Sequence, residues 1–305
     1  MKSAHLTIFF LLIGMSPVCQ ADIFGRDDRV DILSRPELKE YSRAVAVGVI
    51  NGLWTDKGNG FSELWADPID EFMCKDERFI KEKSVSYACT GFLVAEDLLV
   101  TAGHCAVNVG EISNSSENYC EAYTWLFDYN SQTDTSNIPN ENIYKCKEII
   151  YAIQSEVDGQ SHDFALIKLD RKAIDRRPFK LAKMSASLNQ SVTMIGHPMG
   201  LPMKFAGNAR IIKTNVGRSF YTNLDAFSGN SGSPVLNSRN EVVGVLVAGN
   251  PANSTYTDQS LRCERYNRCD DLGRNCRALP SNNSSEGFPN TFSEVQNIQY
   301  YLDKF

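Results

Sequence analysis

Three short segments of this 305-residue chain carry the residue types of a nucleophilic active site, in a fixed order. They are Thr101-Ala102-Gly103-His104-Cys105, then Asp163-Phe164-Ala165-Leu166-Ile167-Lys168-Leu169, then Gly229-Asn230-Ser231-Gly232-Ser233-Pro234. A serine hydroxyl is a poor nucleophile at neutral pH unless a neutral imidazole takes its proton and a buried carboxylate stabilises the resulting imidazolium. His104, Asp163 and Ser231 offer these three groups, so we expect them to act together.

Each of these residues also has a plainer explanation. A lone histidine is more often structural, an aspartate before an apolar run is usually a turn residue, and Gly-x-Ser-Gly alone is typical of a hairpin turn. Here His104 follows a strand-like run, and Asp163 opens an apolar run in which a carboxylate needs a partner. His162 and His197 lack such a context and are interpreted as structural or surface residues. The order His, Asp, Ser favours the catalytic interpretation.

The small residues around Ser231 serve a second purpose. Glycine lets the backbone turn tightly and expose a hydroxyl. It also lets the N–H groups of Gly229 and Ser231 point at one spot, where they would hold the oxyanion of a tetrahedral intermediate. One such donor contributes about 3–4 kcal/mol to transition-state stabilisation in enzymes that use an oxyanion hole.

The composition excludes several classes of function. With 42% hydrophobic and 22% charged residues, the chain can bury a core in one large domain or two small ones. Its net charge of −6 argues against a general nucleic-acid binder, because no basic stripe is present for phosphate contacts. No segment after residue 21 approaches the roughly 20 apolar residues that span a bilayer. The sequence implies no metal or organic cofactor and leaves the oligomeric state open.

The N-terminus has the pattern of an export signal. Lys2 precedes the apolar run Leu6 to Gly14, and Ala21 is a suitable cleavage point. A buried helix or a membrane anchor is the alternative, but the run is short for an anchor. We therefore expect residues 1–21 to be a signal peptide and the protein to be secreted or periplasmic. The charged residues 22–41 are interpreted as an N-terminal extension or propeptide.

Removal of residues 1–21 leaves eight cysteines, an even number that suggests disulfides in an exported chain. They allow 105 complete pairings, of which one pair can be proposed. Cys89 and Cys105 flank an expected hairpin that ends at His104, and a bridge there would contribute about 3 kcal/mol. Three other cysteines lie within residues 263–276. If all eight are paired, at least one of these three must reach back to the first half of the chain.

Short apolar runs between turn residues predict a protein made mainly of antiparallel strands, in a sandwich or a barrel. The expected strands cover residues 44–50, 89–95, 98–102, 122–127, 148–153, 164–169, 191–195, 209–213, 218–223, 234–237 and 241–248. Residues 171–180 are interpreted as a polar linker between two strand-rich halves. The apolar positions of residues 292–302 fit one face of a helix.

Taken together, these features resemble the trypsin-like (chymotrypsin-fold) serine endopeptidases over residues 42–305. The resemblance rests on the cysteines flanking His104, the Asp-initiated strand, the nucleophile loop and the closing segment Gly287-Phe288-Pro289-Asn290. Gly196-His197-Pro198-Met199-Gly200-Leu201-Pro202 and Asn223-Leu224-Asp225 are similar to the bacterial branch near the glutamyl endopeptidases.

The resemblance implies an all-β fold of two antiparallel Greek-key β-barrels with a C-terminal helix. The first barrel would cover about residues 42–175, the second about 181–290, and the closing helix about 292–304. His104 would act as general base and then acid, Asp163 would orient it, and Ser231 would attack the substrate. Gly229 and Ser231 would form the oxyanion hole. The substrates would be proteins or peptides.

The sequence departs from this family at several positions. Asn230 stands where trypsins carry an aspartate that pairs with a new N-terminus, so trypsin-style activation is not expected. Leu246 stands where glutamyl endopeptidases need a histidine, which disfavours a Glu-binding pocket. Val247 replaces a family serine that helps to hold the aspartate.

The resemblance also implies a specificity pocket lined by Asp225, Ala226 and Gly249. Asp225 lies six residues before Ser231, the trypsin spacing, and would bind Arg or Lys before the scissile bond. The alternative is that it caps a turn or points to solvent. A Glu/Asp or small apolar preference is the second possibility. A third is a non-catalytic exported binding or adhesion protein on a protease scaffold. Residues 250–286 are interpreted as a disulfide-stapled insertion rather than a zinc site, because they contain no histidine.

Overall fold

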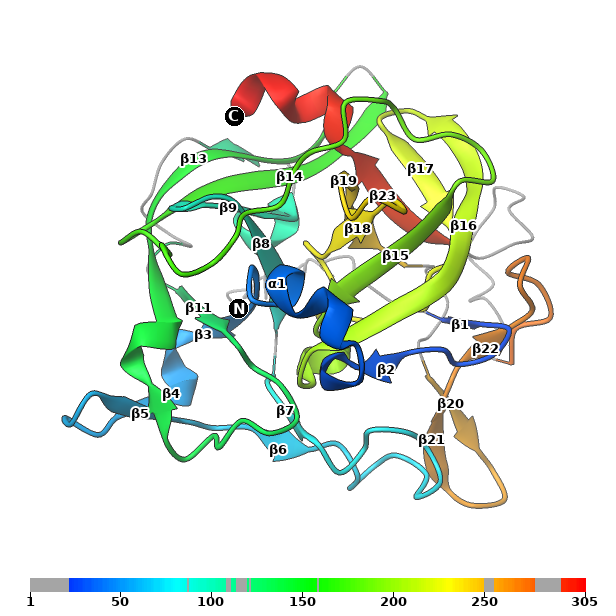
Figure 1. Ribbon diagram of the computed structural model, residues 1–305. Helices are drawn as coiled ribbons and strands as arrows, with labels where there is room; N and C mark the ends of the chain where they lie inside the picture. Colours follow the sequence, from blue (N-terminus) through cyan, green and yellow to red (C-terminus); the bar gives the residue numbers. More distant parts are fainter. Residues whose placement is uncertain are drawn as a thin grey trace, which may run out of the picture.

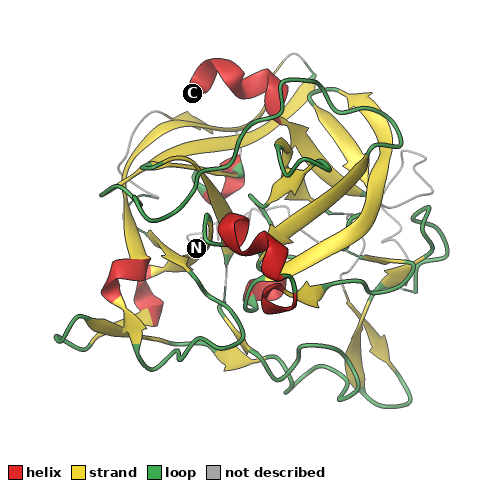
Figure 2. Cartoon of the chain, in the orientation of Figure 1, coloured by secondary structure: helices red, strands yellow, loops and turns green. Residues whose placement is uncertain are grey.

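A computed structural model describes residues 22–86, 88–107, 111–113, 120, 122–157, 159–249, 255–277 and 292–305. The expected signal peptide and the segment 287–290 lie outside these residues. Strands dominate the described chain, and its helices are short (Figure 2). Within the described residues, none of the helices has the length and apolar character to cross a membrane.

The first barrel is a closed antiparallel sheet. Its strands are β3 (Val45–Ile50), β8 (Cys89–Ala95), β9 (Leu98–Thr101), β11 (Tyr123–Phe127), β13 (Ile143–Val157) and β14 (Gln160–Leu169). They are ordered β13-β11-β3-β8-β9-β14, and the pairing of β13 with β14 closes the ring. The short β10 (Glu111–Ser113) adds to the outer edge of β13. The fully buried Phe92, Trp125 and Phe164 fill this barrel, because alternate strand residues point inward.

The second barrel is built in the same way and lies beside the first (Figure 1). Its strands are β15 (Ser191–Gly196), β16 (Lys204–Val216), β17 (Ser219–Thr222), β18 (Pro234–Leu236), β19 (Val242–Ala248) and β23 (Ser293–Asn297). The order is β15-β18-β19-β23-β17-β16, and β15 pairs with β16 to close it. The predicted all-β, two-barrel fold is therefore confirmed, and all eleven expected strand runs overlap observed strands.

Smaller elements decorate the two barrels. The other strands are β1 (Ile23–Phe24), β2 (Val30–Asp31), β4 (Trp54–Asp56), β5 (Phe61–Leu64), β6 (Asp67–Pro68), β7 (Lys83–Ser84), β12 (Ile138–Pro139), β20 (Thr255–Asp258), β21 (Cys263–Tyr266) and β22 (Arg268–Cys269). The helices are α1 (Lys39–Ser42) and the 3-10 turns η1 (Ile32–Ser34), η2 (Pro36–Leu38), η3 (Asn51–Leu53), η4 (Gly103–Cys105), η5 (Asn140–Asn142), η6 (Pro198–Gly200) and η7 (Ile298–Lys304).

The closing segment differs from its sequence-based prediction. The helix expected over residues 292–302 begins only at Ile298, because residues 293–297 form β23. This strand pairs with both β17 and β19 and completes the second barrel. The spacing of apolar residues in this segment favours a helix only weakly. Hydrogen bonding to the two neighbouring strands outweighs that preference.

The N-terminal segment packs against the second barrel. Strand β1 pairs in parallel with β22, so that Ile23 lies opposite Arg268, and β2 pairs with β16. Ile23 and Phe24 are both buried. Because residues 22–31 fill space inside the fold, their loss would expose apolar surface of the second barrel.

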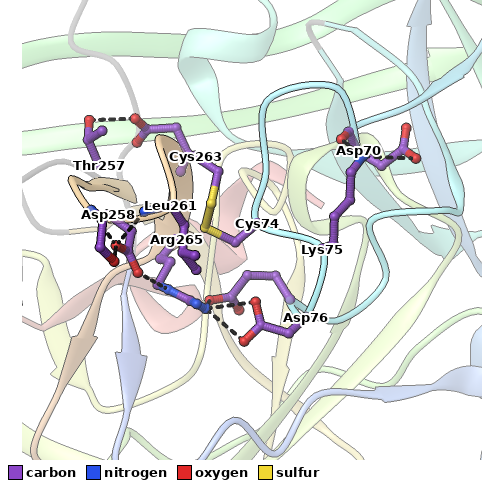
Figure 3. The surroundings of a disulfide bond; sticks show 12 residues. Asp70, Cys74, Lys75, Asp76, Thr257, Asp258, Leu261, Cys263 and Arg265 are labelled. Carbon is purple, nitrogen blue, oxygen red and sulfur yellow. Dashed lines mark hydrogen bonds and ion pairs between the residues drawn. A yellow bond between two sulfur atoms is a disulfide. The ribbon is translucent and has the colours of Figure 1, made fainter.

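Four disulfides connect the described cysteines. Cys89–Cys105 forms as expected, and the others are Cys74–Cys263, Cys120–Cys146 and Cys269–Cys276. Cys263 reaches back 189 residues to Cys74, as the cysteine count required. Figure 3 shows this bridge beside Arg265, whose guanidinium contacts both Asp76 and Asp258. The insertion is thus fastened to residues 70–77 by a covalent bond and by ion pairs.

Candidate active site

His104 lies in the one-turn helix η4, immediately after β9. Its backbone N–H donates to Asp163 Oδ1 at 2.9 Å, and its Nδ1 lies 2.7 Å from Asp163 Oδ2. Asp163 is inside β14 rather than at its start, and β14 pairs with β9. Gly103 permits this contact, because a Cβ there would lie 1.9 Å from the carbonyl oxygen of Ile153. The structure therefore brings together two of the three predicted catalytic side chains.

The carboxylate controls the charge on the imidazole. Burial of the ring lowers the pKa of His104, but the negative charge and the hydrogen bond of Asp163 outweigh burial, and the net pKa lies above the ordinary value. The bond to Nδ1 also leaves Nε2 as the nitrogen available to a nucleophile.

Ser231 belongs to the loop between β17 and β18. Its carbonyl accepts the backbone N–H of Thr90 at 2.7 Å, and Thr90 belongs to β8 of the first barrel. A Cβ on the next residue, Gly232, would lie 2.0 Å from the Thr90 carbonyl and 3.0 Å from the amide nitrogen of Ala102. The nucleophile loop therefore contacts the strand end that carries His104. Within the described residues, no hydrogen bond joins the Ser231 hydroxyl to the His104 ring.

Hydrogen bonds to two carbonyls fix the orientation of the Ser228–Gly229 and Asn230–Ser231 peptide planes. The carbonyl of Ser228 accepts the N–H of Met199, and the carbonyl of Asn230 accepts the N–H of Ser233 at 2.8 Å. In a trans peptide the N–H points opposite to the carbonyl, so the amides of Gly229 and Ser231 point away from these contacts. Within the described part of the chain, neither amide donates a hydrogen bond. Both remain available to an oxyanion.

The other two histidines in the described chain are buried. The ring of His197 bonds through Nδ1 to the carbonyl of Leu201 at 3.0 Å, and burial lowers its pKa to about 4. His162 packs edge-on against Tyr301. Both agree with the structural interpretation made from the sequence.

Asp225 does not have the surroundings of a pocket base. Its side chain is buried, its Oδ1 accepts the N–H of Phe24 at 2.7 Å, and its Oδ2 accepts the N–H of Asp28 at 3.2 Å. Burial raises the pKa of Asp225 well above the ordinary value; the Phe24 amide opposes this, and the charge of Asp28 adds to it. The Asp225 carboxyl group thus binds backbone amides of this same chain, which argues against the prediction that it binds Arg or Lys of a substrate. Ala226 is also buried, whereas Gly249 is half-buried.

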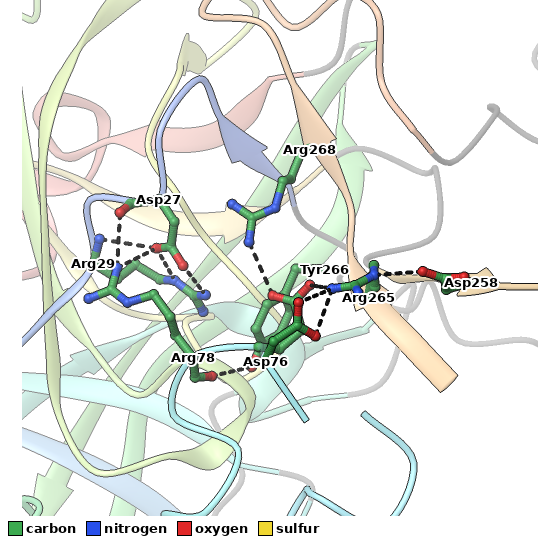
Figure 4. Close-up of polar contacts among 9 residues, drawn as sticks. Asp27, Arg29, Asp76, Arg78, Asp258, Arg265, Tyr266 and Arg268 are labelled. Atoms are coloured by element: carbon green, nitrogen blue, oxygen red, sulfur yellow. Dashed lines mark hydrogen bonds and ion pairs between the residues drawn. The ribbon is translucent and has the colours of Figure 1, made fainter. Parts of the chain in front are cut away.

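A buried arginine holds the same N-terminal segment in place. The guanidinium of Arg29 pairs with both carboxylate oxygens of Asp27 at 2.9 Å (Figure 4). It lies over the rings of Phe227 and Tyr266, at 4.2 and 4.6 Å from their centroids. Phe227 is two residues from Asp225, so the residues next to the expected pocket pack against this chain's own N-terminal segment. The sequence alone could not reveal this, because residues 22–31 have no clear pattern.

The sequence analysis also missed a carboxyl behind Asp163. Glu294 in β23 accepts the hydroxyl of Ser219 at 2.6 Å. Burial raises its pKa, the Ser219 hydroxyl opposes that shift, and the nearby charge of Asp163 adds to it. Glu294 stands among other polar residues of the closing run, so the sequence offered no distinctive signal for it.

Comparison with known proteins decides the family. The sequence profile of the trypsin-like peptidase domain matches residues 89–245, which is more than half of the chain. The chain belongs to this family. It is accordingly a serine endopeptidase, a hydrolase whose substrates are peptides or proteins.

Solved structures of proteases are similar to this one at low identity. A Glu endopeptidase in complex with MPD is 17% identical, with 74% of this chain and 87% of that chain covered and a TM-score of 0.46. The active form of the Rv3671c protease from M. tuberculosis is 15% identical, with 99% and 94% covered and a TM-score of 0.46. Neuropsin, a serine protease expressed in the limbic system of mouse brain, is 15% identical, with 70% and 86% covered and a TM-score of 0.44.

Proposed function

We propose that this endopeptidase cleaves peptide bonds through an acyl-enzyme on Ser231, with His104 as general base and acid and Asp163 as its orienting carboxylate. The observation that carries this proposal is the double hydrogen bond from His104 to Asp163, at 2.9 and 2.7 Å. It fixes both the position of the ring and its tautomer, which a proton-transferring imidazole requires.

The reaction follows from these roles. His104 Nε2 removes the proton of the Ser231 hydroxyl as the oxygen bonds to the substrate carbonyl carbon. The carbonyl oxygen becomes an oxyanion, which the amides of Gly229 and Ser231 stabilise. Collapse breaks the C–N bond, and His104 gives its proton to the leaving amine. Water, activated by His104, then hydrolyses the ester and frees Ser231.

The cysteine chemistry supports an oxidising compartment. All eight described cysteines are in disulfides, and such bonds persist outside the reducing cytosol. We propose that residues 1–21 direct export and that the protein works in the periplasm or outside the cell.

The preference for the residue before the scissile bond is also a proposal. The buried Asp225 does not favour Arg or Lys, and the apolar Leu246 does not favour Glu. The remaining alternative, a small apolar residue, therefore fits best. Cleavage of an unbiased peptide library, read by mass spectrometry, tests it; a sequence motif with Arg or Lys before the cut would refute it.

Replacement of the nucleophile is the most direct test of the catalytic proposal. Ser231→Ala should lower turnover by on the order of 10⁴-fold or more and abolish labelling by a fluorophosphonate probe. Ser238→Ala, an exposed serine on the turn after β18, is the matched control and should behave as the parent does. Unchanged turnover in Ser231→Ala would remove this serine from the mechanism. A folded parent protein that neither labels nor cleaves any peptide would favour the binding-protein alternative.

A further inference from the structure

Thr90 is a buried polar residue in the otherwise apolar strand β8, and it makes four hydrogen bonds. Its backbone N–H donates to the carbonyl of Ser231, and its own carbonyl accepts the hydroxyl of Thr101, both at 2.7 Å. Its side-chain Oγ1 donates to the carbonyl of Gly229 at 2.7 Å and accepts the N–H of His197 at 3.1 Å.

These bonds connect three segments around the candidate site. Ser231 and Gly229 belong to the nucleophile loop, and Thr101 ends the strand that leads into His104. His197 begins the segment 197–200, in which the N–H of Met199 holds the carbonyl of Ser228. The Thr90 side chain therefore contacts both the nucleophile loop and the segment 197–200. These are the two segments whose hydrogen bonds orient the amides of Gly229 and Ser231.

Only a hydroxyl can make both side-chain bonds at this position. It has one hydrogen to donate and lone pairs to accept with, and here both capacities are used. Without it, the carbonyl of Gly229 and the amide of His197 would each lose a buried partner. Gly229 has φ of +93°, a left-handed conformation that few residues other than glycine adopt. The hydrogen bond from the Thr90 hydroxyl to its carbonyl helps to hold the backbone in this conformation.

We propose that Thr90 is a positioning residue for this reaction, and that its hydroxyl holds the oxyanion-binding amides in register by fixing the Gly229 carbonyl. The inference rests on the proposed function and deepens it. Thr90 touches neither substrate nor reacting atoms. Because the oxyanion exists only after attack, a loosened hole weakens transition-state binding more than substrate binding.

The experiment compares Thr90→Val, which keeps shape and loses the hydroxyl, with Thr90→Ser, which keeps the hydroxyl. Thr90→Val should lower kcat by on the order of 10–100-fold with KM changed less than about 3-fold, and Thr90→Ser should recover most of that loss. The affinity of a peptide boronate, which forms a tetrahedral adduct on the serine, should fall in parallel with kcat. Thr124→Val, a buried threonine of the same barrel that accepts from the Trp54 indole, controls for the loss of a buried hydroxyl and should keep kcat.

Wild-type kcat in folded Thr90→Val would overturn the inference, as would a loss that Thr90→Ser does not recover. Equal losses in Thr90→Val and Thr124→Val would also overturn it, because they would reflect general destabilisation. If Thr90→Val does not fold, Thr90→Ala is compared with Thr90→Ser, and equal kcat in those two variants is the refuting result. Fluorophosphonate labelling of Ser231 in the parent protein separates the two proposals: without it the catalytic proposal fails, and with it the result concerns Thr90 alone.

Discussion

The two halves of the candidate site are held in different ways. In the first barrel, His104 lies in η4, which follows β9, and Asp163 lies in β14. Strands β9 and β14 are hydrogen bonded to each other, and the Cys89–Cys105 bridge ties η4 to β8. In the second barrel, Ser231 lies on a loop without strand or helix, held by single bonds from other segments. The first half depends on charge and side-chain contact, and the second depends on backbone conformation. Substitutions in the two halves should therefore lower activity for different physical reasons.

Among the substitutions that test how the two halves are supported, the largest effect is expected at Asp163. Asp163→Asn keeps the size of the side chain but can present an N–H to His104 Nδ1, which favours the wrong tautomer. Turnover should fall by on the order of 10⁴-fold near neutral pH. Steady-state kinetics measure this, and thermal unfolding checks that the variant remains folded. A loss below about tenfold would show that Asp163 does not orient the ring.

The second half is tested by Gly229→Ala. A Cβ would lie 2.5 Å from the carbonyl oxygen of His197 and 2.8 Å from the amide nitrogen of Gly200, at a positive φ. The loop must move, and kcat should fall by on the order of 10²–10³-fold. Gly159→Ala is the matched control, since Gly159 has φ of +69° with no heavy atom within 4 Å of the added Cβ. Equal kcat in the two variants would contradict a role for the loop conformation.

The pH dependence of activity tests how Asp163 affects the pKa of His104. His104 must be neutral to accept a proton, so kcat/KM should fall about tenfold per pH unit below its pKa. Because Asp163 raises that pKa, the midpoint should lie above the ordinary histidine value of 6.5. In Asp163→Asn the midpoint should move to lower pH. A profile that is flat between about pH 5 and 9 would exclude His104 as the base.

The smallest effect on activity is expected at Asp225. Its raised pKa means that the folded state binds a proton more tightly than the unfolded state does. The stability from this group is present below the unfolded pKa, near 3.8, and is lost as pH rises through the folded pKa. Asp225→Asn should therefore lose less free energy of unfolding than the parent as pH rises above the unfolded pKa, as measured by urea titration. Its cleavage preference should stay unchanged; loss of an Arg/Lys preference in this variant would restore the pocket interpretation.

The strands were predictable because their pattern is local. Alternating or continuous apolar runs between turn residues mark β8 and β19, and the cysteine spacing marks the Cys89–Cys105 bridge. Failures occurred where distant contacts decide the outcome. The segment 293–297 is a strand because it pairs with β17 on one side and β19 on the other. Asp225 is buried against the backbone amides of Phe24 and Asp28, which lie about two hundred residues earlier in the sequence.

The sequence by itself determined the family and the all-β class, and it named the three candidate catalytic groups, because motif order and short-range periodicity are visible without coordinates. Tertiary structure alone decided how those groups are supported. The contacts of Thr90 with Gly229 and of Arg29 with Phe227 join residues 139 and 198 positions apart. No local pattern encodes such pairs, because each joins residues that are far apart in the sequence and whose buried polar groups find partners only in the folded chain.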